Sequence, residues 1–219
     1  MSIRARKLGF WSAVLSALFS ITWFVTFILQ DTLQKMPDWH NLEAYAEAFS
    51  TLRILYTYPS LLLAITYLIL VVCIHASSRE ELKIWTLISL SIGIVYATIA
   101  SINYNIQTVA VRQSLYYGEI SGLELWIPDN AHSIFNALAN SYVYMAISMF
   151  FLGFVFQGGK LSQWIKGLLL LQAISAIGQI GWSMFDLSEG FFLTTSIVWI
   201  IGAPVVFILL AIYFRSSGD

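Results

Sequence analysis

Residues 132–157 read HSIFNALANSYVYMAISMFFLGFVFQ, an apolar run long enough to cross a bilayer. Polar side chains recur through this run at intervals of four residues, at His132, Asn136, Asn140, Tyr144 and Ser148. On a helix such a row forms a ridge that turns slowly, so the first three side chains share one face and the last two drift off it. Because lipid cannot hydrogen-bond an amide, these side chains are predicted to face other helices or a water-filled cavity.

Composition places the whole chain in one membrane domain, residues 1–219. The sequence is 58% hydrophobic and 16% aromatic, with 11% charged residues and a mean hydropathy of +0.77. Soluble domains carry about 25% charged residues. The net charge of −1 argues against nucleic acid as a partner, since nucleic-acid binding asks for a basic face. The single cysteine, Cys73, excludes an internal disulfide framework and a multi-cysteine metal site.

Hydropathy predicts an all-α, polytopic bundle of six transmembrane helices, at about 8–30, 52–76, 84–107, 132–157, 161–186 and 190–214. Two of the loops are longer: residues 31–51 join the first and second spans, and residues 108–131 join the third and fourth. From Asn41 onward, apolar residues at helical spacing predict a helix lying on the membrane surface between the first two spans. Arg53 near this junction is expected to snorkel to the interface, with pairing to a loop carboxylate as the alternative. Pro204 is predicted to kink the last helix.

The distribution of Lys and Arg predicts the orientation. Eight cations fall on the N-terminal side: Arg4, Arg6, Lys7, Arg79, Lys83, Lys160, Lys166 and Arg215. The opposite side keeps Lys35, Arg53 and Arg112. Because cytoplasmic loops collect positive charge, both termini are predicted to be cytoplasmic, and the loops 31–51 and 108–131 to lie outside.

In this orientation the polar membrane residues gather toward the outer ends of the helices. The candidate ligand-binding residues are Asn103, Asn105, Gln107, His132, Asn136, Asn140, Gln179, Trp182 and Asp186. One interpretation is an outward-facing cavity that binds a small polar or amphipathic ligand through amides and aromatic rings. The other is packing, since interhelical amide bonds stabilise bundles by roughly 0.5–2 kcal/mol each and need no ligand.

Catalytic and metal-binding patterns are not found in the sequence. His40, His75 and His132 are predicted to lie in separate regions, so they cannot form one zinc site, and neither a metal nor a cofactor is expected. A secondary transporter or channel-like protein is an alternative, although the two halves show no repeat. An intramembrane or lipid-modifying enzyme is another, and it would need His132 with Asp186 or a loop carboxylate in reach. The nucleophile motif of rhomboid proteases is absent.

Two segments carry a family resemblance: KLGFWSAVL at residues 7–15 and FVFQGGK at residues 154–160. With these segments the chain resembles small bacterial multipass membrane proteins of unassigned activity. The resemblance implies a six-helix bacterial membrane protein and transfers no site. We therefore expect a non-enzymatic protein of the cytoplasmic membrane that contacts lipid and binds a small ligand or a partner protein in its outer half.

Overall fold

The computed structural model describes residues 3–34 and 39–216, and over that part of the chain all regular structure is helical. Six segments there are long and apolar enough to cross a membrane, which confirms the predicted all-helical fold with six candidate membrane spans. The spans are built on α1 (Ile3–Leu33), α3 (Thr57–Ser77), α4 (Lys83–Asn105), α7 (Ser141–Gly153), α8 (Lys160–Phe185) and α9 (Glu189–Ser216).

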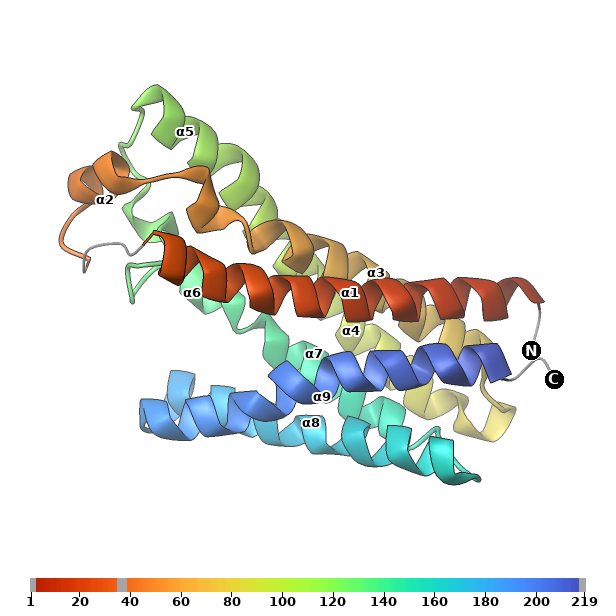
Figure 1. Ribbon diagram of the computed structural model, residues 1–219. Helices are drawn as coiled ribbons and strands as arrows, with labels where there is room; N and C mark the ends of the chain where they lie inside the picture. The colour runs from red at the N-terminus through yellow and green to blue at the C-terminus, as the bar shows by residue number, and fades with distance from the viewer. Residues whose placement is uncertain (1–2, 35–38, 217–219) are drawn as a thin grey trace.

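The six spanning helices form a closed ring. Each packs against the helix before it and the helix after it, and α9 packs along α1 to complete the circuit (Figure 1). The start of α1 and the finish of α9 lie at the same end of the bundle, called here the terminal end (Figure 1). The opposite end carries α2 (Leu42–Ala48), α5 (Arg112–Tyr117) and α6 (Ile134–Ala139), and is called the cap end.

A short helix, α2, stands where a surface helix was predicted between the first two spans. It begins after Asn41, whose side chain accepts a hydrogen bond from the Ala44 N–H at 2.8 Å and so satisfies a free donor of the first turn. A single 3-10 turn, η1 (Thr51–Ile54), then leads into α3. Residues 35–38 of the predicted 31–51 loop, with Lys35 among them, lie outside the described residues.

The third span is longer than predicted. A π-helical stretch, η3 (Ile106–Val111), and then α5 carry it to Tyr117, so the expected end at residue 107 is wrong. The polar residues at the predicted boundary find partners inside the protein: Gln107, the expected last helical residue, donates to the Trp126 carbonyl, and Thr108, the expected first loop residue, donates to the Tyr104 carbonyl. The helix ends at Gly118, whose φ of +73° suits the left-handed cap position.

The fourth span, predicted as one helix over 132–157, is two helices. It breaks at Asn140, where α6 ends and α7 begins, and α7 stops at Gly153. Gly153 allows close packing, because a Cβ there would meet the Leu170 side chain of α8 at 2.8 Å. The last span matches its prediction closely: α9 contains Pro204 and bends along its length (Figure 1).

Three helices are joined in the bundle interior by a buried hydroxyl network centred on Ser148 of α7. The Tyr67 hydroxyl of α3 donates to Ser148 Oγ at 2.7 Å. Ser148 Oγ donates to the Ser89 carbonyl of α4 at 2.7 Å, and Ser89 Oγ returns a bond to the Ser148 carbonyl at 2.8 Å. All three side chains are buried. Gly93 permits this approach, since a Cβ there would lie 3.3 Å from Ser148 Oγ.

Replacing Ser148 with alanine should lower the free energy of unfolding by about 1–2 kcal/mol, because it leaves the Tyr67 hydroxyl without its acceptor in a dry interior. Unfolding by titration with a denaturing detergent would measure the change. Ser91→Ala is the matched control, since Ser91 is exposed and bonds only to the Leu87 carbonyl of its own helix. Equal stability of the two variants would contradict a tethering role for the network.

Candidate functional site

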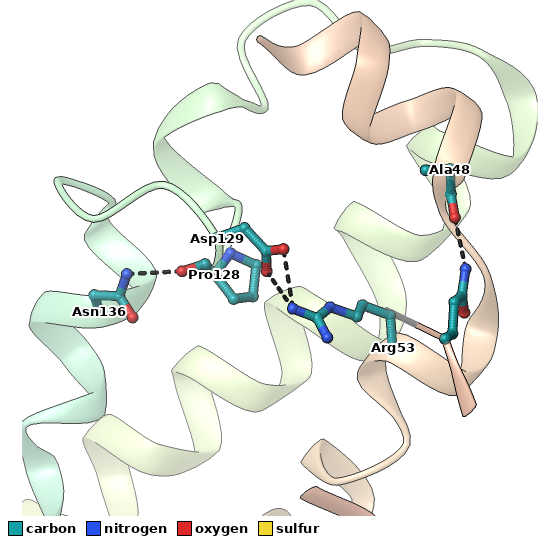
Figure 2. Close-up of polar contacts among 6 residues, drawn as sticks. Ala48, Arg53, Pro128, Asp129 and Asn136 are labelled. Atoms are coloured by element: carbon teal, nitrogen blue, oxygen red, sulfur yellow. Dashed lines mark hydrogen bonds and ion pairs between the residues drawn. The ribbon is translucent and has the colours of Figure 1, made fainter. Parts of the chain in front are cut away.

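The cap end is held together by an ion pair between Arg53 of η1 and Asp129 of the loop before α6 (Figure 2). Arg53 Nη2 lies 3.2 Å from Asp129 Oδ1 and 3.0 Å from Oδ2. The two side chains are only 14% and 13% exposed. The prediction that Arg53 snorkels to the interface is therefore wrong, and the alternative of pairing holds. A carboxylate supplied by the second loop offers the guanidinium a better partner than lipid headgroups do.

Amide side chains of the helices fix that loop in place. Asn136 of α6 donates to the Pro128 carbonyl at 2.8 Å (Figure 2) and to the Asn130 carbonyl at 2.9 Å. Gln107 donates to the Trp126 carbonyl at 2.6 Å, and Asn130 donates to the Glu124 carbonyl at 3.0 Å. Each bond satisfies a loop carbonyl that would otherwise face apolar surroundings. The amides thereby hold Asp129 within reach of Arg53.

The other loop is anchored in the same way. Gln34 at the end of the first span donates to the Ala48 carbonyl at 2.6 Å and accepts a hydrogen bond from the Ser50 hydroxyl. Tyr45 of α2 is buried beside the ion pair, and its hydroxyl has no hydrogen-bond partner among the described residues. Burial, and then the nearby Asp129 carboxylate, raise the pKa of Tyr45, so its phenol stays protonated at neutral pH.

Four of the nine predicted site residues have amides that reach across elements. Asn136 and Gln107 bond to the cap loop as described. Asn103 is fully buried and donates to the Phe135 carbonyl of α6 at 3.2 Å, while its own Oδ1 has no partner in the described part of the chain. Gln179 of α8 reaches the Ala139 carbonyl at 3.5 Å, the long limit of a hydrogen bond. These amides therefore tie α4 and α8 to α6 and its loop.

The other five predicted residues are not brought into this group. Asn140 is half-buried at the break between α6 and α7. Asn105 is exposed and bonds to the Ser101 carbonyl of its own helix at 2.9 Å. His132, Trp182 and Asp186 are all exposed. Trp182 stacks on Phe192 with ring centroids 4.8 Å apart, and Asp186 is the left-handed cap of α8, with a φ of +51°.

A cluster of aromatic rings lies inside the ring of helices, and it was mostly missed from the sequence. Tyr142 of α7 stands at its centre, with ring-centroid distances of 5.0 Å to Trp199 of α9, 5.7 Å to Tyr96 of α4 and 6.2 Å to Trp23 of α1. Its hydroxyl accepts a hydrogen bond from the Tyr104 hydroxyl at 3.1 Å. Four helices therefore contribute rings to one place, called here the Tyr142 cluster.

Several polar atoms in and beside the Tyr142 cluster are buried without a partner among the described residues. They are Tyr96 Oη, Trp199 Nε1, Asn103 Oδ1 and Ser141 Oγ. An unsatisfied buried donor or acceptor costs about 1–3 kcal/mol, and native interiors keep few of them. Tyr96 and Trp199 both pack on Tyr142, while Ser141 and Asn103 are the chain neighbours of Tyr142 and Tyr104. This region thus combines aromatic walls with unused hydrogen-bonding capacity.

No three His, Cys, Asp or Glu side chains gather to hold a metal ion anywhere in residues 3–34 and 39–216. The chain was also compared with known proteins. No protein-family model matches it, and neither does any curated protein or solved structure.

Proposed function

We propose that this chain is a non-enzymatic multipass protein of a bacterial cytoplasmic membrane with the terminal end in the cytoplasm. Eight Lys and Arg residues in the terminal-end segments, against three toward the cap end, support that orientation. The cap, with α2 and the loop around Asp129, then faces outward. Its ion pair and amide bonds build a folded lid over the outer half of the ring.

Within that outer half we propose a binding site for a small polar or amphipathic ligand at the Tyr142 cluster. The observation that carries this proposal is that Tyr96 Oη and Trp199 Nε1, on two rings that pack on Tyr142, are buried without a hydrogen-bond partner among the described residues. Trp199 Nε1 can only donate and the Tyr96 hydroxyl can donate or accept, so a ligand that satisfies both must carry an acceptor, with a donor beside it as the better match. Aromatic rings on several sides favour a compact group with an apolar or cationic face. Small amides and amines meet this description.

A panel of small amides, amino acids and aromatic amines tests the site through thermal unfolding of the purified protein in detergent. A probe at about one hundred times its Kd should raise Tm by roughly 5 °C or more. Trp199→Phe keeps an aromatic ring and removes the N–H together with the five-membered ring of the indole, so it should shrink that rise. The matched control is Trp164→Phe, because Trp164 is 68% exposed near the terminal end. No response to any probe, or an equal response in both variants, would remove the site assignment.

A further inference from the structure

A cavity of about 420 Å³ lies at the terminal end of the bundle, and none of its lining residues belongs to the Tyr142 cluster. It is enclosed by the end of α3, the turn between α7 and α8, and the end of α9. Its lining is mixed: Ile74, Val155 and Phe156 are apolar. The polar lining residues include Arg79, Gln157, Ser77, Ser78 and Ser162. A cavity lined by both apolar and polar side chains suits an amphiphile with a polar headgroup.

Arg79 is the charged group of this cavity. Its Nη2 donates to Gln157 Oε1 at 2.6 Å, and its Nε lies 3.3 Å from the Glu81 carboxylate. A guanidinium has five N–H donors, so these two contacts leave three for another acceptor. The side chains of Arg79 and Glu81 are 61% and 63% exposed, so water screens the attraction between them. The terminal end carries eight Lys and Arg residues, whereas its acidic residues within the described part of the chain are Glu80 and Glu81. This excess of positive charge favours an anionic ligand.

The remaining polar groups divide into donors and acceptors. Ser162 is half-buried in the first turn of α8, and its hydroxyl makes no hydrogen bond within the described residues, so it is available to donate. Ser77 and Ser78 already donate to the carbonyls of Cys73 and Ile74, both at 2.7 Å, so toward the cavity they can only accept. The lining of the cavity therefore contains donors for an anion, on Arg79 and Ser162, and acceptors for a hydroxyl or ammonium group, on Ser77 and Ser78.

We propose that this cavity binds a phosphate ester that also carries a hydroxyl or ammonium group, with Arg79 and Ser162 holding the phosphate and Ser77 and Ser78 accepting from the second group. Arginine suits this role because its planar fork matches phosphate geometry. The position also suits it, since Arg79 joins α3 to the 3-10 turn η2 (Glu80–Leu82) at the end of a span, the depth at which headgroup phosphates lie. Two kinds of molecule carry such an ester: a phospholipid, in its headgroup, and a small soluble phosphate ester.

Native mass spectrometry of the purified protein with added phosphatidylglycerol tests the proposal. Arg79→Gln should reduce the lipid-bound fraction about tenfold, because it removes the charged donors. Arg215→Gln, which removes an exposed cation that does not line the cavity, is the matched control and should bind lipid as the unmodified chain does. Ser162→Leu, which narrows the cavity and removes the Ser162 donor without changing charge, covers the case in which Arg79→Gln fails to fold, and it should lose the lipid as well.

Further probes separate the two sources of the phosphate. Phosphatidylcholine has no donor for Ser77 and Ser78 and should bind less than phosphatidylglycerol. Displacement of the lipid by glycerol 3-phosphate would assign the site to a soluble ester, and retention would assign it to the headgroup. Unchanged lipid binding in both Arg79→Gln and Ser162→Leu would overturn the proposal, as would an equal loss in Arg215→Gln. Neither result bears on the Tyr142 cluster, whose probes are not phosphate esters.

Discussion

Replacing Asp129 with asparagine is expected to lower the free energy of unfolding by about 2–4 kcal/mol. The change keeps the size of the side chain and removes its charge, so the Arg53 guanidinium loses the anionic partner that both of its contacts to Asp129 reach, at a place where only 14% of its side chain is exposed. Breaking a fully buried pair in this way typically costs about 3–5 kcal/mol, and the slight exposure here reduces that figure. Unfolding in mixed micelles, followed by circular dichroism, would measure the loss.

A double-mutant cycle separates this pair from the rest of the cap. Arg53→Met should also destabilise the protein. The double variant, Arg53→Met with Asp129→Asn, should lose less free energy of unfolding than the two single variants lose together. The pair between Lys83 and Glu80 is the comparison, since its atoms are closer, at 2.7 Å, but its side chains are 39% and 86% exposed. Glu80→Gln should change stability little. Additive effects of the two cap variants would show that the cap ion pair is not coupled.

Apolar length predicted the fold well, because each span must satisfy its backbone within one helix. The predicted helix boundaries were wrong where side-chain hydrogen bonds satisfied backbone carbonyls of the helix or of the loop. Gln107 looked like the last residue of the helix and Thr108 like the first residue of the loop, yet both are buried and bonded, and the helix passes through them. Asn140 looked like one more step of a four-residue ridge, yet the helix breaks there. Neither outcome is visible without knowing which carbonyls lie nearby.

The site was predicted only in part, for a related reason. Polarity within an apolar run indicated that Asn103, Gln107 and Asn136 face protein, and all three bond across elements. Polarity alone does not distinguish a side chain that crosses to another element from one at the surface, such as exposed Asn105. Trp23, Tyr96 and Tyr142 gave no signal, because an aromatic residue in a spanning helix has the same pattern whether it faces lipid or the interior. Their convergence depends on the ring closure between α9 and α1.

That closure also depends on how tightly the α8–α9 hairpin packs, and Gly178 is its closest point. A Cβ built on Gly178 would overlap the Thr195 side chain of α9. Thr195 cannot rotate away freely, since its hydroxyl donates to the carbonyls of Phe191 and Phe192, both at 2.9 Å. Gly178→Ala is therefore expected to lower the free energy of unfolding by about 2–3 kcal/mol, even though alanine favours a helix over glycine by about 1 kcal/mol.

The same helix provides the control for this prediction. Gly167 is exposed, and a Cβ there meets nothing within 4 Å, so Gly167→Ala adds helix propensity without a clash. It should leave the protein as stable as before or slightly more so. Because α9 also carries Trp199, separation of the hairpin in Gly178→Ala should move that ring and red-shift its fluorescence. If Gly178→Ala and Gly167→Ala had the same free energy of unfolding in detergent, α8 and α9 would have room to separate. That result would contradict the claim that their close packing fixes the geometry of the Tyr142 cluster.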